Sequence, residues 1–320
     1  MEPIKEPTPL VLVTSSPHMH CGLTIGKSMR EVMLALVPAI IASVYYFRMS
    51  AAIVMVTCVV SAIVFETICN KVMHKPNTVQ DGSAALTGLL LAMCLPASMP
   101  PLFAAMGSMF AIVVGKAVFG GLGCNIFNPA HIGRAILLAS FPQQMTNWVL
   151  PATAAASDAV STATPLAVMR ATEKIWQAGG AASAAKLPDL MNLFWGNVGG
   201  SLGETCVPAL VLGGLYLIYK KLIDWRIPVF YLVTVAILTG VYGAVMGYPS
   251  TFPLYHLFAG GLMIGAFFMA TDWVTSRLPK RQDHLCHWPG CPDLPDPSAW
   301  QLHRRRLLFH PDDEHGHPDD

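Results

Sequence analysis

Eight apolar stretches, most of them close to the length of a membrane-crossing helix, dominate this chain of 320 residues. A helix needs about 20 mainly apolar residues to cross a bilayer, and lipid offers the backbone no hydrogen-bonding partner, so we expect these stretches to be helical. They cover residues 31–47, 51–70, 82–97, 102–123, 131–150, 205–219, 228–247 and 254–275. The third and fifth are weaker, because they are short or interrupted by glycine, histidine and arginine. The sequence therefore predicts an all-α polytopic membrane protein with about eight transmembrane helices.

Composition supports this fold class and excludes some partners. Hydrophobic residues make up 53% of the chain and charged residues 12%, against about 25% charged in an average soluble protein. The net charge of +1 supplies no basic face large enough to neutralise a phosphate backbone, so we expect no nucleic-acid partner. Nothing near Met1 resembles a cleaved signal peptide, and the apolar stretches themselves are expected to drive insertion into the lipid bilayer.

Lysine and arginine cluster in the connections between these stretches. Short cytoplasmic loops carry an excess of both residues. With a cytoplasmic N-terminus, all four clusters fall on the cytoplasmic side, and only Arg48 lies in a tight outer loop. This orientation places residues 151–203, and with them Thr164, on the outer face. The clusters consist of Lys27 and Arg30, Lys71 and Lys75, Lys220, Lys221 and Arg226, and Lys280 and Arg281.

The long polar interruption contains the hydroxyl-rich stretch DAVSTATPL at residues 158–166. One interpretation is a loop in which these hydroxyls cap a helix that begins at Pro165. The other is an accessible attachment point for a covalent cofactor, since loops of small residues expose their hydroxyls. Sequence physics alone favours the helix cap.

Five predicted spans precede this loop, so the following span starts from the opposite side of the membrane. An odd number of spans in each half is what an inverted repeat requires. The third span of each half also places small residues in a leucine-rich helix with an aspartate at its cytoplasmic end, Asp81 and Asp272. The same small residues could simply allow helices to pack closely.

Several motifs occur together between residues 10 and 276. They are SPH at 16–18, DGS at 81–83, FGGLGCNIFNPA at 119–130, GRA at 133–135, DAVSTATPL at 158–166, GGSLGET at 199–205 and FMATD at 268–272. The combination resembles the D subunit of the Rnf complex, a family related to the B subunit of the sodium-pumping NADH:quinone oxidoreductase. The short N-terminal segment favours the Rnf branch.

This resemblance implies ten helices in two inverted five-helix repeats, in the inner (cytoplasmic) membrane and with other Rnf subunits as partners. It implies a redox subunit of a translocase that couples electron transfer between ferredoxin and NAD to sodium or proton movement. It further implies FMN joined through its phosphate to a threonine, which by motif is Thr164, and a flavin transferase that attaches it. Asp158, Ser161 and Thr162 lie beside it, and Thr162 stands where the family commonly has glycine.

Ionisable residues within spans are expensive to bury and suggest function. The candidates are Lys116, Arg134, His131, Glu66 and His256. Lys116 and Arg134 flank the turn with Asn125 and Asn128. In one interpretation this turn binds a phosphate, or the polar edge of a second, non-covalent flavin such as riboflavin. In the other, Asn128 and Pro129 only break a helix, and Arg134 caps carbonyl groups. We assign no metal site.

The chain divides into five segments. They are a cytoplasmic segment at 1–30, a first helical repeat at 31–150, an outward loop at 151–204, an incomplete second repeat at 205–276, and an atypical tail at 277–320. The tail lacks apolar periodicity where family members continue into two further spans, so we expect a frame shift or disorder and the loss of the C-terminal helices. Two competing functions remain: a non-redox transporter or channel of inverted-repeat type, and a purely structural assembly subunit.

Overall fold

The computed structural model describes residues 24–75, 78–151, 161–177, 187, 189–204 and 206–272. These residues belong to one unit of the chain, Met1–Ser276. The SPH motif, Asp158 and the atypical tail lie outside the described residues. Most of the described chain is helical, which confirms the predicted fold class of apolar helices.

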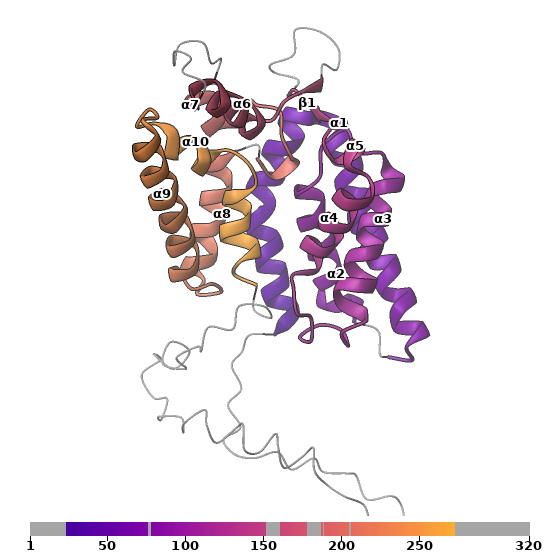
Figure 1. The fold of residues 1–320 in the computed structure, drawn as a ribbon. Helices are drawn as coiled ribbons and strands as arrows, with labels where there is room; N and C mark the ends of the chain where they lie inside the picture. Colours follow the sequence, from indigo (N-terminus) through magenta and orange to yellow (C-terminus); the bar gives the residue numbers. More distant parts are fainter. Residues whose placement is uncertain are drawn as a thin grey trace, which may run out of the picture. The chain divides into compact units, whose positions relative to one another are not determined.

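The first two predicted spans form one long helix with a sharp break. Helix α1 covers Ile25–Val72, and Arg48 alone has non-helical torsion angles within it, with φ 52° and ψ −134°. A positive φ is uncommon outside glycine. The chain changes direction at this residue (Figure 1). The two predicted spans, 31–47 and 51–70, therefore lie on either side of the break.

Shorter elements complete the first half of the unit. They are η1 (Val79–Asp81), α2 (Ser83–Met93), α3 (Pro101–Ile112), the π-helical η2 (Val113–Ala117), α4 (Pro129–Ser140) and α5 (Pro142–Met145). With 11 and 12 residues, α2 and α4 each extend for about 17–18 Å, roughly half of a bilayer. The span expected at 131–150 ends at Ser140, because proline at 142 disfavours helical backbone in the residue before it.

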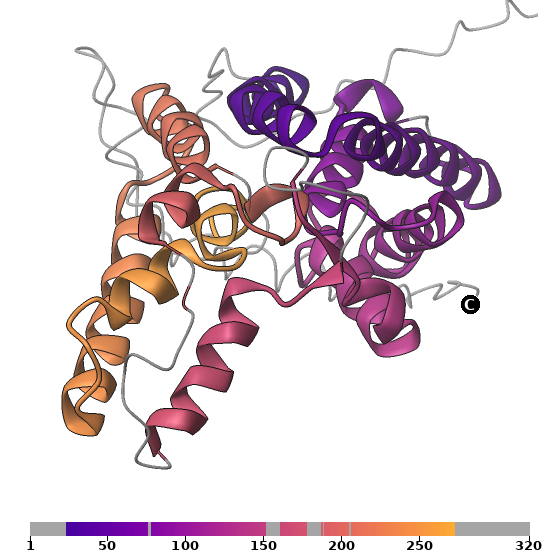
Figure 2. The same ribbon diagram turned by 90° about the horizontal axis from the view of Figure 1, so that it is seen from above.

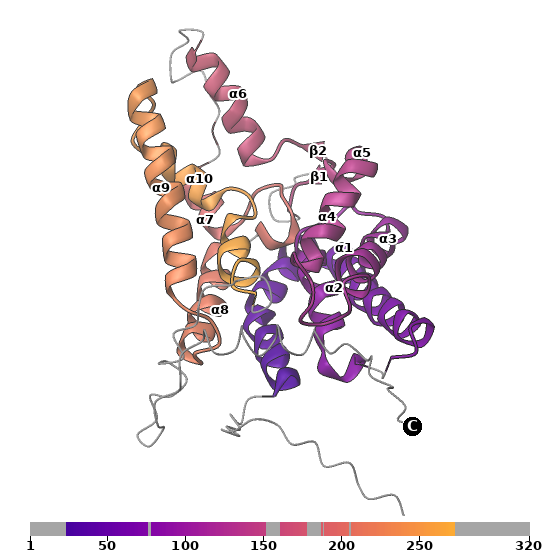
Figure 3. The same ribbon diagram turned by 60° about the horizontal axis from the view of Figure 1, so that its bottom comes forward.

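The polar interruption folds into small elements across one end of the helices. Strands β1 (Trp148–Val149) and β2 (Ser161–Thr162) pair antiparallel, with Trp148 opposite Thr162. Helices α6 (Pro165–Gln177) and α7 (Leu190–Trp195) follow. Figure 3 shows the strands leading from α5 into α6. In Figure 2 α6 is seen along its length, whereas the first part of α1 is seen nearly end on. The two helices therefore run in clearly different directions.

The second half contains two unbroken apolar helices and one broken one. Its elements are η4 (Leu202–Glu204), α8 (Val207–Tyr219), α9 (Arg226–Met246), α10 (Phe252–Phe258), α11 (Leu262–Ile264) and the π-helical η5 (Gly265–Met269). The last three form a pair of segments bent by 64°. Gly260, with φ 72°, lies at the bend, and its freedom to adopt a positive φ accounts for the break.

Length and apolar composition identify the helices that could cross a membrane. Helices α1 and α9 qualify, and the bent pair qualifies as a third if it counts as one span. The shorter apolar helices are α2, α3 with η2, and α8. Since α1 has 48 residues and a break at Arg48, its length is enough for two crossings. The total of eight spans stays a prediction.

Backbone contacts in the core join the two halves. Helix α1 contacts α2, α3 and α8. The Leu202 amide donates to the Leu95 carbonyl at 3.0 Å, and Pro96 and Ser201 form an isolated β-bridge. The buried Ser43 hydroxyl donates toward the Leu202 carbonyl at 2.7 Å. These bonds satisfy non-helical backbone groups of both halves within the protein.

Candidate functional site

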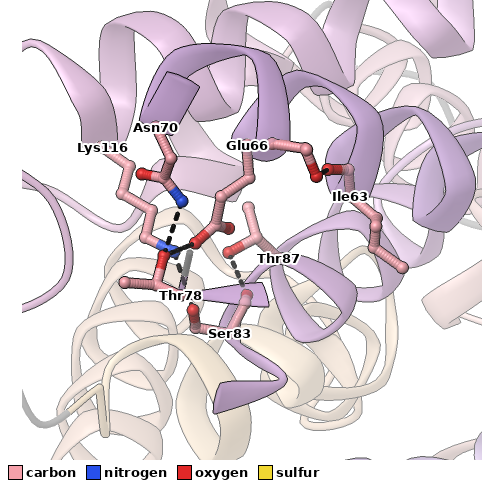
Figure 4. A network of polar contacts seen from close by, with 8 residues as sticks. Ile63, Glu66, Asn70, Thr78, Ser83, Thr87 and Lys116 are labelled. Atoms are coloured by element: carbon pink, nitrogen blue, oxygen red, sulfur yellow. Dashed lines mark hydrogen bonds and ion pairs between the residues drawn. The ribbon is translucent and has the colours of Figure 1, made fainter. Parts of the chain in front are cut away.

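A buried ion pair joins the second part of α1 to η2. Lys116 Nζ lies 2.8 Å from Glu66 Oε1, and the two side chains are only 5% and 3% exposed. Lys116 also donates to the Ser83 hydroxyl at 2.7 Å, and the Thr78 hydroxyl donates to Glu66 Oε1 at 2.6 Å (Figure 4). Asn70 donates in turn to Thr78 at 3.0 Å. The network therefore links α1, the segment before η1, α2 and η2.

One atom of this network lacks a partner. Glu66 Oε2 is buried and accepts no hydrogen bond from the described residues. A buried carboxylate oxygen without a donor is costly. The positive charge of Lys116 balances the negative charge of the Glu66 carboxylate, but it does not replace the missing hydrogen bond. The π-helical turn of η2 that carries Lys116 is of a kind found frequently at functional sites.

Lys116 and Ser83 also line a cavity at this end of the helices, which we name the amide cavity. Asn125 and Asn128 border it, and the other polar lining residues are Ser28, Thr87, Thr271 and Asp272. Asn128 Oδ1 caps α4 by accepting from the Ala130 amide at 3.0 Å, and Asn125 Nδ2 donates to the Phe127 carbonyl at 3.1 Å. The Asn128 NH₂ group and the Asn125 carbonyl oxygen are not used in these two bonds. The amide cavity therefore offers a ligand both a donor and an acceptor, a pattern that suits the imide edge of a flavin.

The four residues predicted around this turn separate into two places. Lys116, Asn125 and Asn128 lie around the amide cavity, but Arg134 is not among its described lining residues. Arg134 follows Asn128 by six residues, which places it about 9 Å further along α4. It lies within electrostatic reach of Cys94, His131 and Glu204, and its buried Nε has no hydrogen-bond partner among the described residues.

Thr164 stands at the beginning of α6. Its Oγ1 accepts a hydrogen bond from the Ala167 amide at 3.2 Å, and its carbonyl accepts one from Val168 at 3.0 Å. This arrangement is the N-cap that the sequence indicates. The backbone of Ser161 and Thr162 lies just upstream, in β2.

Thr164 also lines an open hollow along α6. The other lining residues are Leu166, Ala167, Arg170, Ala171 and Lys174. The threonine hydroxyl is therefore accessible, lies at a helix N-terminus and has two cationic side chains on the same hollow. An anionic phosphate ester fits such a position, because amide groups at a helix start and nearby cations both favour negative charge.

Sequence reasoning did not identify several of these residues. Thr78 and Ser83 carry no individual signal, since hydroxyls are common at helix starts. The pairing of Lys116 with Glu66 had a signal: both are ionisable residues in apolar stretches, where each needs a partner. Arg170 and Lys174 stand in an amphipathic segment after Thr164, and their spacing of four residues places them next to each other on one face of a helix.

Comparison with known proteins places the chain among membrane redox subunits. Residues 12–283 match the model of the NQR2, RnfD, RnfE family. The D subunit of the proton-translocating ferredoxin:NAD(+) oxidoreductase complex of Clostridium ljungdahlii is 48% identical over 266 residues, which cover 82% of this chain and 78% of the relative. Its counterpart in the Na(+)-translocating complex of Acetobacterium woodii is 42% identical over 282 residues, covering 87% and 82%. The D subunit of the ion-translocating oxidoreductase complex of Rhodobacter capsulatus is 39% identical over 286 residues, covering 82% and 78%.

Proposed function

Because the chain belongs to the NQR2, RnfD, RnfE family, we propose that it is the D subunit of an Rnf-type complex and carries covalent FMN on Thr164. In this proposal it relays electrons within a membrane translocase that couples ferredoxin and NAD chemistry to ion movement. Its partners are the other membrane subunits of that complex. The names of two relatives specify different ions, protons and sodium, so the proposal covers either cation.

The observation that carries the flavin proposal is the position of the Thr164 hydroxyl. It lies at the N-cap of α6 and borders the open hollow, so a flavin transferase has access to it. Transfer from FAD would form a bond between Thr164 Oγ1 and the FMN phosphorus, break the pyrophosphate bond, and release AMP and the hydroxyl proton. The Ala167 amide would then face a phosphate oxygen. FMN, when bound, supplies one- and two-electron transfer, and its protein surroundings tune its potential.

The amide cavity supports the proposal of a second, non-covalent flavin. Asn125 and Asn128 offer one acceptor and one donor, and Lys116 supplies a positive charge at the wall. A flavin without a phosphate, such as riboflavin, presents a matching imide edge. These residues would hold and orient the ring, and the apolar lining would exclude water.

The basic residues support an orientation with Thr164 outside. Lys27, Lys71 and Lys220 lie near the ends of α1 and α8, at the end of the unit opposite α6 (Figure 1). Excess lysine and arginine marks the cytoplasmic side. The proposal therefore places α6 at the outer surface of the inner membrane, where an amphipathic helix lies stably in the interface.

Fluorescence in a denaturing gel tests this function against its competitors. The chain is expressed together with a native flavin transferase, and the gel is viewed under ultraviolet light. We expect a fluorescent band for the wild-type chain, none for Thr164→Ala, and an unchanged band for the Thr162→Ala control. A dark wild-type band would favour a non-redox transporter or an assembly subunit. A band that persists in Thr164→Ala would show that the flavin is attached to another residue, and Thr162 would be the first one to test.

A further inference from the structure

We propose that Arg170 and Lys174 form the counter-charge of the covalent flavin and stabilise its reduced form. This inference rests on the proposed function, since it assumes that FMN is attached to Thr164. Both side chains line the hollow on α6 that also contains Thr164. Their role would be to set the potential of the flavin, not to attach it.

The spacing of residues on α6 builds a surface on which a flat ligand can lie. Ala167 and Ala171 are four residues apart, and both are exposed, so they form a shallow floor along the helix. Leu166, Arg170 and Lys174 follow one another at intervals of four and form the ridge beside this floor. A ring tethered at Thr164 would have alanine beneath it and cationic side chains beside it.

Side-chain direction brings both cations toward the tether. The α-carbons of Arg170 and Lys174 lie about 9 Å and 15 Å beyond that of Thr164 along the helix. Helical side chains tilt toward the N-terminus of their helix. The long side chains of Arg170 and Lys174 line the hollow together with Ala167 and Ala171, the part that a ribityl chain and ring would occupy.

The described carboxylates leave both charges unpaired. Among the described residues, the ion pairs within 4.0 Å are Lys116 with Glu66 and His256 with Glu173. Glu173, the acidic residue of α6, thus faces His256 on α10 at 3.8 Å. Arg170 and Lys174 remain available to a ligand in the hollow.

The opposite face of α6 is already occupied by the protein. Met169 and Thr172 are 1% and 2% exposed, and Met169 packs in a cluster with Leu193, Phe252 and Tyr255. The hollow with Arg170 and Lys174 therefore points away from the apolar core of this chain. Reduced flavin carries an additional negative charge on its pyrimidine ring, and two cations at that ring favour this form.

Redox titration of the covalent flavin in the purified complex tests the inference. We expect Arg170→Gln/Lys174→Gln to lower the midpoint potential. At a fixed potential and low salt, the ratio of oxidised to reduced flavin should rise by about fivefold for each charge removed, since a unit charge at 4 Å contributes about 1 kcal/mol in water. High salt should reduce the difference. The single variant Lys174→Arg keeps the charge and should therefore have the same midpoint potential as the wild type.

The matched control is Lys220→Gln/Lys221→Gln, which removes two positive charges after α8, at the other end of the helices. It should titrate like the wild type. An unchanged potential in Arg170→Gln/Lys174→Gln, or an equal shift in the control, would overturn the inference. If the double variant carries no flavin, Lys174→Gln alone, whose charge lies further from the tether, decides by the same criterion. A dark wild-type gel band would instead refute the proposed function.

Discussion

Lys116 and Glu66 are 50 residues apart in the sequence, yet Nζ of the first lies 2.8 Å from Oε1 of the second in a buried environment. Each charge would be expensive to bury alone, and together they bind α1 to η2. Lys116 of this pair lines the amide cavity, so the pairing with Glu66 affects the charge that the cavity presents to a ligand.

Breaking this pair is predicted to destabilise the protein strongly. Lys116→Met leaves the Glu66 carboxylate buried without a counter-charge, which should cost about 3–5 kcal/mol. The double variant Lys116→Met/Glu66→Leu removes both charges and should recover most of the loss. Thermal unfolding in detergent, followed by circular dichroism, measures both changes. Equal destabilisation in the single and double variants would contradict the prediction, because removal of the unpaired carboxylate would then recover nothing.

A single variant should separate the role of Thr164 as a helix cap from its role in flavin attachment. Asparagine is a good N-cap but has no hydroxyl. Thr164→Asn is therefore expected to keep α6 folded and to abolish the fluorescent gel band, whereas Thr164→Ala loses both the cap, worth about 1 kcal/mol, and the band. Limited proteolysis of α6 reports the cap. Covalent flavin in Thr164→Asn would contradict the assignment.

The second flavin is predicted to depend on the amide cavity. Asn125→Leu removes the carbonyl oxygen left free at its wall without changing the Asn128 cap of α4. Acid precipitation should release less non-covalent flavin from this variant than from the wild type, while the fluorescent gel band stays unchanged. Equal release from both proteins would place the second flavin elsewhere.

Close packing of α2 against α1 makes Gly88 sensitive to size. A Cβ atom at this position would lie 2.6 Å from the Cys58 carbonyl oxygen. Gly88→Val should consequently push the helices apart and cost several times more than the about 1 kcal/mol typical of point variants. Gly265→Ala is the control, because a Cβ there meets nothing within 4 Å. Melting temperatures of the two variants compare the effects.

The proposed membrane orientation predicts which surfaces a polar reagent reaches. A cysteine at Ala171, on the exposed face of α6, should react with an impermeant maleimide in intact cells when Thr164→Ala is also present, so that no attached flavin covers the thiol. A cysteine at Lys221, in the connection after α8, should react only after the membrane is opened. The reverse pattern would invert the orientation and place Thr164 in the cytoplasm. Native cysteines are replaced beforehand so that only the introduced thiol is labelled.

Hydrophobic length predicted where the helices lie, but not how they end. Apolar residues at 228–247 and 205–219 correspond closely to α9 and α8. In lipid such a run satisfies its own backbone hydrogen bonds by forming a helix. The expected span at 131–150 was too long, since Pro142 stops α4 and mainly polar residues follow it before the apolar residues at 148–150. A hydropathy average over many residues hides a single proline, whereas that proline ends the helix.

Tertiary distance is the part that sequence could not supply. Lys116 and Arg134 flank the same turn in the sequence, yet only Lys116 borders the amide cavity. The regular rise of α4 carries Arg134 away from the turn, and the partner of Lys116 comes from α1 instead. Glu66 and Lys116 could each be recognised as ionisable residues in apolar surroundings, but their contact depends on how α1 and η2 pack.

The hydrogen bond from the Leu202 amide to the Leu95 carbonyl has a consequence for biosynthesis. A ribosome makes Leu95 long before Leu202, and during that interval the carbonyl beyond α2 has no partner from the second half. A polar group left unpaired in lipid is costly. The Leu95 carbonyl is therefore satisfied only after η4 has been made and has packed against the end of α2, so the second half of the chain completes the hydrogen bonding of the first.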